Sequence, residues 1–208
     1  MSEAILLSPV GKREQTKVQN RQAILDAARE VFGELGYDNT TVRDIIRRTG
    51  LAAGTFYNYY RSKEEVATAL SDDGARRFAP ILKSIRAQAK GWDDFVRSAI
   101  LAYYEFLADE HESWLAKRPP EETQPHVYGE TPEMAAVFRE VRDAIVERIT
   151  TGDRPPADPD YLAAACIGVA REVGEHMLAK RPIETKAAAA FATAMILTGL
   201  KGLSEGAA

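Results

Sequence analysis

The chain has a single cysteine, Cys166, among its 208 residues. One cysteine excludes an intrachain disulfide, and its position among Ala165, Ile167 and Val169 is typical of a small buried apolar residue rather than a redox centre. No apolar run approaches the ~20 residues that a membrane-spanning helix requires. The first residues, MSEAILLSPVGKRE, place no positive charge before their short apolar stretch, so they do not resemble a secretory signal. We therefore expect a cytoplasmic protein that does not enter a membrane.

A large excess of charge is also missing, because the net charge is only −4. The charges are unevenly distributed: residues 12–63 carry ten Lys and Arg against six Asp and Glu, a local balance of +4, which leaves −8 for the remainder. DNA affinity depends on local neutralisation of phosphates, so this distribution suits a DNA-binding protein, although ordinary fluctuation explains it equally well. Residues 1–16 are predicted to form a flexible basic arm. Its Lys12 and Arg13 either reach DNA or belong to a solvated tail.

No segment alternates polar and apolar residues as a strand would, so the predicted fold class is all-α. Apolar side chains at helical spacing predict an N-terminal three-helix unit followed by a larger helical body. The Thr-Pro pair at 131–132 and the Asp-Pro pair at 158–159 each indicate a helix start. The predicted domains are the arm at 1–16, a helix-turn-helix DNA-binding domain at 17–65, and a ligand-binding and dimerisation domain at 66–208.

The most informative segment is residues 40–65, TTVRDIIRRTGLAAGTFYNYYRSKEE. One of its two opening threonines is placed to cap a first helix, and Gly50 suits the left-handed residue that ends it. Phe56 and Tyr60 are four apart and are expected to face the core, which leaves hydroxyl- and amide-bearing side chains of a second, short helix exposed. This is the layout of a helix-turn-helix that places its second helix in the major groove of DNA.

Seven side chains of this segment are predicted to contact DNA: Thr41, Arg43, Thr55, Tyr57, Asn58, Tyr59 and Lys63. Thr55 and Asn58 are the best candidates for base edges, since Asn pairs bidentately with adenine and the Thr methyl group packs on thymine. Arg43 reaches a base or a phosphate, or remains a solvated arginine. Tyr57, Tyr59 and Lys63 are expected to bind phosphates. Such contacts orient a protein on DNA without reading its sequence. The alternative for Tyr59 is packing on the preceding helix.

The same segment resembles the DNA-binding domain of the tetracycline-repressor (TetR) family of bacterial regulators. The residues that match the family pattern are Thr41, Ile45, Gly50, Leu51, Gly54, Tyr57, Tyr59, Tyr60, Ser62 and Lys63. The preceding ILDAAREVFGELGYDNTT is similar to the family's first helix, so the resemblance covers about residues 20–66. Departures are Thr49 for the usual Ala, Ala52 for Ser and Tyr60 for Phe. The resemblance also implies phosphate contacts by Tyr57 and Lys63.

The last two predicted helices, at about 159–180 and 184–203, are rich in small side chains. Helix 184–203 is apolar over much of its circumference. Either a partner subunit covers it, or it is the central core helix of a monomer. The resemblance implies a homodimer in which these helices pair with their twins as a four-helix bundle. Two-fold symmetry then predicts a palindromic double-stranded DNA operator with half-sites ~34 Å or somewhat more apart.

A small-molecule pocket is expected between the helices of the body. The candidate lining residues combine apolar surface with polar tips: Phe95, Tyr103, Tyr104, His111, Trp114, Phe138, Arg142, Glu172 and His176. A core or surface role explains each of them singly as well. Glu172 and His176 are four apart, which favours a helical salt bridge over a metal site, because a third metal ligand is missing. No metal or other cofactor is predicted.

The sequence thus predicts a regulator, most simply a repressor, that a small apolar or aromatic effector releases from DNA. The alternative is a DNA-binding module controlled by a protein partner. A helical enzyme that uses His111, His176 or Cys166 is not predicted, because the chain offers no nucleophile–base motif, phosphate loop or metal triad.

Overall fold

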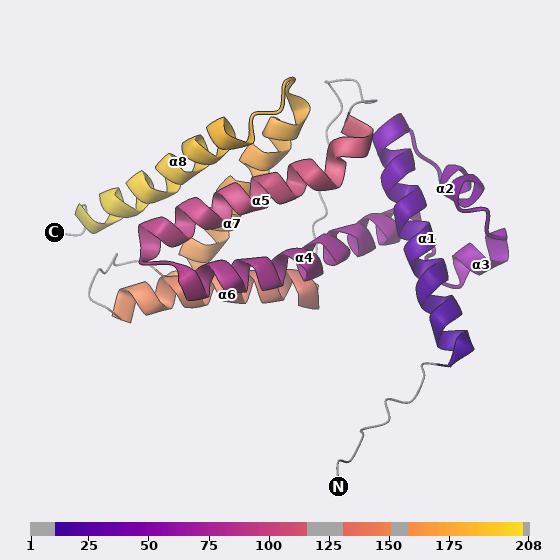
Figure 1. Ribbon diagram of the computed structural model, residues 1–208, viewed down its shortest axis with the longest axis horizontal. Helices are drawn as coiled ribbons and strands as arrows, with labels where there is room; N and C mark the ends of the chain where they lie inside the picture. The colour runs from indigo at the N-terminus through magenta and orange to yellow at the C-terminus, as the bar shows by residue number, and fades with distance from the viewer. Residues whose placement is uncertain (1–10, 116–130, 151–157, 206–208) are drawn as a thin grey trace, which may run out of the picture.

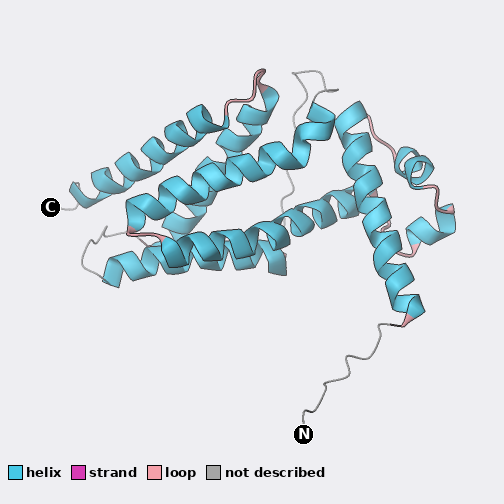
Figure 2. Cartoon of the chain, in the orientation of Figure 1, coloured by secondary structure: helices cyan, strands magenta, loops and turns pink. Residues whose placement is uncertain are grey.

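The computed structural model describes residues 11–115, 131–150 and 158–205, and all regular secondary structure within these ranges is helical (Figure 2). The helices are α1 (Lys12–Leu35), α2 (Val42–Thr49), α3 (Ala53–Tyr57), α4 (Lys63–Gln88), α5 (Trp92–Leu115), α6 (Pro132–Thr150), α7 (Pro159–Ala179) and α8 (Thr185–Glu205). Figure 1 shows α1 to α3 gathered at one end of the molecule as a head, and α5 to α8 forming a body. The predicted all-α architecture is confirmed.

The head closes around a small apolar core. Ile24, Leu25 and Ala28 of α1 pack with Ile45 of α2 and Phe56 of α3, and all five are fully buried. The first three recur at the spacing of one helical face, which explains why α1 presents them together. The helix-turn-helix is therefore fixed to α1 by burial of the apolar faces predicted from the sequence.

Helix α4 belongs to both parts of the molecule. Its N-terminal residues Val66 and Ala69 lie in the head core, whereas Phe78 and Leu82 lie in the body core. Pro80 is accommodated inside the helix, which continues to Gln88. The predicted boundary between 65 and 66 therefore cuts through a structural element that head and body share.

The start of α1 corrects the extent of the predicted arm. Helix begins at Lys12, so residues 12–16, assigned from sequence to the flexible arm, are helical. The Thr16 hydroxyl donates to the Lys12 carbonyl at 2.9 Å. The segment KREQTKVQNRQ contains neither glycine nor proline and is rich in strong helix formers, so propensity extends α1 beyond its buried stripe.

In the body, α5 packs against α4, α6, α7 and α8. Gly174 of α7 makes the closest approach: a Cβ built there would lie 2.9 Å from Leu107 Cδ1 and 3.2 Å from Tyr104 Cε1. The predicted helix starts are confirmed, since the Thr131 hydroxyl accepts from the Met134 amide and the Asp158 carboxylate accepts from the Asp160 amide. No helix in the described ranges is apolar enough over a sufficient length to cross a membrane.

Candidate DNA-binding face and body cavity

Helices α2 and α3 lie on the side of α1 that faces away from the body (Figure 1). Helix α2 opens with a capping box, in which the Thr41 hydroxyl accepts from the Asp44 amide and Asp44 accepts from the Thr41 amide at 3.0 Å. The hydrogen bonds from Thr41 lower the pKa of Asp44. The helix ends at Gly50, whose φ of 67° is left-handed as predicted.

Three of the seven predicted DNA contacts are freely presented. Arg43, Tyr57 and Asn58 are exposed, and the Tyr57 side chain is 54% accessible while its ring stands edge-on to buried Phe56. Helix α3 has only five residues and ends at Tyr57. Asn58 is thus its C-cap, and Tyr59 lies beyond the helix.

The other four predicted contacts are half-buried or engaged within the head. Thr41 is exposed but belongs to the capping box, Thr55 is half-buried, and Tyr59 packs against the head core. The Lys63 ammonium donates to the carbonyls of Tyr37 at 2.9 Å and Asp38 at 3.2 Å, and it lies 4.4 Å from the centre of the Tyr37 ring. Lys63 therefore ties the start of α4 to the turn after α1.

One exposed cation on this face was missed. The Arg47 side chain is 78% accessible, with only a 3.6 Å contact to Asp44. Arg47 lies four residues after Arg43, so helical spacing could have indicated that the two share a face. Arg48 differs, because it is held on α1 by Glu30 at 2.7 Å and Glu34 at 2.5 Å.

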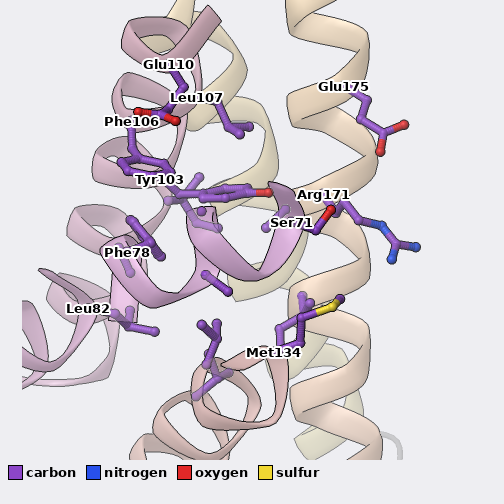
Figure 3. Close-up of a pocket in the computed structure, with 18 of the residues that line it drawn as sticks. Ser71, Phe78, Leu82, Tyr103, Phe106, Leu107, Glu110, Met134, Arg171 and Glu175 are labelled. Atoms are coloured by element: carbon purple, nitrogen blue, oxygen red, sulfur yellow. The ribbon is translucent and has the colours of Figure 1, made fainter. Parts of the chain in front are cut away.

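The body contains a cavity of about 390 Å³ between α4, α5, α6 and α7, with further contributions from α1 and α8 (Figure 3). Two predicted ligand-binding residues, Phe95 and Tyr103, line it. Lining residues that sequence reasoning missed include Phe78, Phe106, Leu107, Met134, Arg171 and Glu175. Most of these are apolar residues of a helical stripe, which periodicity alone assigns equally to a filled core.

The remaining described candidates do not line this cavity. Tyr104 is fully buried against Gly174, and Phe138 packs on the body core outside the lining. Arg142 points instead to Asp160 of α7, with Nε 2.5 Å from the carboxylate. Glu172 and His176 are exposed on α7. The side chains of His111 and Trp114 lie outside the described residues.

An ionic cluster joins head and body beside the cavity. It consists of Arg29 on α1, Asp73 and Arg77 on α4, and Glu110 on α5, and we call it the junction cluster. Asp73 lies 3.5 Å from Arg29 and 3.0 Å from Arg77, while Glu110 pairs with Arg77 and lies 4.0 Å from Arg29. Arg29 and Glu110 also line the cavity. A cavity occupant would thus touch the group of charges that fixes α1 to α4 and α5.

Polar groups of the cavity wall cluster near Tyr103. Burial raises the pKa of Tyr103 to about 12, with Glu175 raising it further and Arg171 opposing. The phenol is therefore a hydrogen-bond donor at any physiological pH. Burial also raises the pKa of Cys166 to about 11, which disfavours the reactive thiolate. Among side chains that the structure describes, no three His, Cys, Asp or Glu are grouped to hold a metal.

A capped helix, a left-handed glycine and a short exposed helix on a three-helix head define a helix-turn-helix protein with an all-helical body. Residues 24–70 match the model of the family described as bacterial regulatory proteins, tetR family. The putative mycofactocin biosynthesis transcriptional regulator MftR of Mycobacterium tuberculosis is 28% identical over 205 residues, which are 95% of this chain and 98% of the relative. Residues 24–70 thus match the DNA-binding domain of the tetR family, and the chain as a whole is similar to a transcriptional regulator over nearly its full length.

Solved structures agree on the fold. A TetR-family regulator from Syntrophomonas wolfei superposes with a TM-score of 0.69 at 20% identity, covering 90% of this chain and 97% of that one. FadR from Bacillus subtilis, solved in complex with stearoyl-CoA, gives a TM-score of 0.67 at 18% identity, covering 86% and 98%. At these identities the likeness establishes the common architecture of head and body.

Proposed function

We propose that the protein is a homodimeric repressor that binds a palindromic operator and leaves it when a small apolar molecule occupies the body cavity. The observation that carries the proposal is the composition of the cavity wall. Arg29 and Phe32 of α1 line the same cavity as residues of α4 to α8. A ligand that binds there contacts the helix supporting the DNA-binding face. Its affinity will therefore differ between an arrangement of head and body that binds the operator and one that does not.

On the head, we assign DNA contacts first to Arg43, Tyr57 and Asn58, because these side chains are exposed on the helix-turn-helix. Arg47 joins them as a phosphate contact. The side chains of Thr41 and Lys63 act mainly within the head. This division separates groups that bind DNA from groups that shape the surface.

We assign the dimer interface to α7 and α8. Tyr161 is 76% accessible, Phe191 57% and Met195 50%, which are large exposed areas for apolar side chains. Phe191 and Met195 are four apart on α8, between exposed alanines at 187, 190 and 194. In Figure 1, α8 lies at the outer edge of the body. An apolar stripe flanked by small residues favours close packing of a second copy's helices.

The effector is assigned to the cavity because of its size and lining. A volume of about 390 Å³ falls within the ~300–1,000 Å³ typical of small-molecule sites. Its lining is mostly aliphatic and aromatic, with a few polar groups near Tyr103. FadR of Bacillus subtilis, which shares this fold, was solved with stearoyl-CoA, a ligand with a long apolar chain.

The test begins by selecting the DNA sequence that the full-length protein prefers, and then measures affinity by fluorescence anisotropy over a salt series. Arg43→Ala should weaken binding about tenfold, as expected for loss of a contact worth ~1–3 kcal/mol, and it should lower the salt slope by ~0.9 if the contact is a phosphate. Arg97→Ala is the matched control, because Arg97 is an exposed arginine on α5. Equal DNA affinities of the two variants would refute the proposed DNA-binding face.

A further inference from the structure

The cavity is longer than it is wide. On α5 its lining runs from Trp92 to Glu110 through Phe95, Val96, Ala99, Ile100, Tyr103, Phe106 and Leu107. Eighteen residue steps of helix span roughly 27 Å at ~1.5 Å each, whereas a sphere of 390 Å³ is only about 9 Å across. The lining is therefore extended along α5, which favours an elongated space parallel to that helix, and we call this space the channel.

The channel is polar toward one end only. The Phe78 ring of α4 packs at a tilt against the rings of Tyr103 and Phe106 of α5, with ring centres 5.2 and 5.5 Å apart, which joins the two helices at this point. The polar lining residues lie at Tyr103 and beyond it toward the head: Arg29, Tyr37, Ser71, Glu110, Arg171 and Glu175. From Ile100 back to Trp92 the α5 wall is apolar, apart from one indole N–H. An occupant that matches this wall has an apolar tail and a polar head group.

Both hydrogen-bond donors and a carboxylate lie near Tyr103. Figure 3 shows the Tyr103 hydroxyl directed toward Ser71 and the helix that carries Arg171. Among the described residues, the Arg171 Nε is buried without a hydrogen-bond partner and the guanidinium lies 3.5 Å from Glu172, although Figure 3 shows it directed away from Tyr103. Glu175 lies one turn further along α7; its charge raises the pKa of Tyr103, and it has interactions of its own. Donors that await an acceptor favour a carboxylate or carbonyl oxygen over an ammonium.

We propose that the effector is an unbranched aliphatic amphiphile whose alkyl chain lies along α5 toward Trp92 and whose acceptor head group, a carboxylate in its simplest form, binds Tyr103 and Ser71. The role of this ligand as an effector rests on the proposed function, whereas its binding to the channel does not. A straight chain matches an elongated space better than a fused-ring molecule of equal carbon number does. Specificity thus comes from the shape of the apolar wall and from one polar site.

Binding is tested by calorimetry of the full chain with sodium alkanoates from octanoate to hexadecanoate, kept below their micelle concentrations. Affinity should rise about fourfold for each methylene until the channel is full, the factor expected for ~0.8 kcal/mol per buried CH₂. Undecanoate should bind at least tenfold more tightly than 1-adamantanecarboxylate, which has the same number of carbons. Dodecylamine should bind at least tenfold more weakly than dodecanoate. Affinity that ignores chain length, or that is equal for cage and chain, would overturn the proposal.

Two variants locate the occupant. Gly74 lines the channel from α4, and a Cβ added there would meet no atom within 4 Å, so Gly74→Leu should fill the space without strain. Leucine also favours helix over glycine, so the variant should unfold at a temperature no lower than the wild type. It should bind dodecanoate at least tenfold more weakly, while Ala87→Leu, on the exposed side of the same helix, should bind normally. Undiminished binding by Gly74→Leu would place the ligand elsewhere.

Tyr103→Phe keeps the ring and removes the hydroxyl. It should weaken dodecanoate several-fold more than it weakens dodecan-1-ol, and equal losses for the two would refute the head-group site. Operator affinity is measured separately with and without dodecanoate. If dodecanoate binds as expected and DNA affinity does not change, the chain-binding channel stands and ligand-controlled repression fails. If the protein binds its operator and only another class of molecule releases it, ligand-controlled repression stands and the chain-binding channel fails.

Discussion

Replacement of Thr41 by alanine separates two roles for this residue. The sequence suggested a DNA contact, whereas the structure places the Thr41 hydroxyl in the capping box with Asp44. Loss of an N-cap side chain costs about 1 kcal/mol, within a range of ~0.5–2. If the head is stable by several kcal/mol, its folded fraction stays near one, and DNA affinity should fall less than twofold. A direct contact with a base would cost ~1–3 kcal/mol, or roughly 5- to 150-fold.

Two assays distinguish these outcomes. Hydrogen exchange of the α2 amides measures local opening, and anisotropy with the selected operator measures affinity. Thr41→Ser keeps an acceptor oxygen and should behave like the wild type in both. A Thr41→Ala protein that loses more than about tenfold in DNA affinity while α2 protection is unchanged would show that the capping argument is wrong.

The pH dependence of α2 protection provides a second check on the same cap. The folded-state pKa of Asp44 is lowered, so its contribution is present above the pKa of the unfolded chain and is lost as pH falls through the folded value. Protection of α2 should therefore weaken below about pH 4 in the wild type. In Thr41→Ala this acid-sensitive part should be smaller, because the hydrogen bonds that lower the pKa include one from the missing hydroxyl.

Three further predictions concern the body. Phe191→Glu should convert the dimer to monomer in analytical ultracentrifugation, since it places a charge on the exposed stripe of α8, whereas Ile81→Glu on α4 should leave the assembly intact. Above pH 10 the unfolded chain ionises its tyrosines while Tyr103 stays protonated to about pH 12, so stability should fall over that interval, and less steeply in Tyr103→Phe; identical slopes would contradict the buried phenol. Glu110→Gln should reduce the effector's influence on operator affinity, typically ~1–3 kcal/mol in such systems, with little change in DNA binding alone; unaltered coupling would exclude the junction cluster.

Helix ends that depend on local chemistry could be predicted from the sequence. Gly50 ends α2 in the left-handed region, and the caps at Thr131 and Asp158 start their helices, because each depends only on neighbouring residues. The observed α7 and α8 also begin and end within two residues of the predicted bounds. Such features are decided within one helical turn, which is the range over which sequence patterns are informative.

Roles that depend on distant residues were harder to predict. Lys63 has the residue type and position of a phosphate contact, yet two carbonyls some 25 residues earlier in the chain hold its ammonium. Glu172 and His176 looked like pocket residues, but Gly174 sets which side of α7 approaches α5 and turns them outward. The head group site near Tyr103 emerges only when four helices are assembled. The aromatic and charged residues of a sequence do not reveal which of them line the same cavity.

The attachment of α1 to α4 bears on how a cavity occupant acts at a distance. Lys63 at the start of α4 holds the turn that follows α1, and Asp73, almost three turns later, holds Arg29. Two such ties, one on each side of the buried contacts of Val66 and Ala69, leave little freedom for α1 to pivot on α4. We infer that the head follows the N-terminal part of α4 as one body. Displacement of α4 by a ligand beside Gly74 would then reposition α2 and α3 directly, and no separate chain of intermediates between the two sites is required.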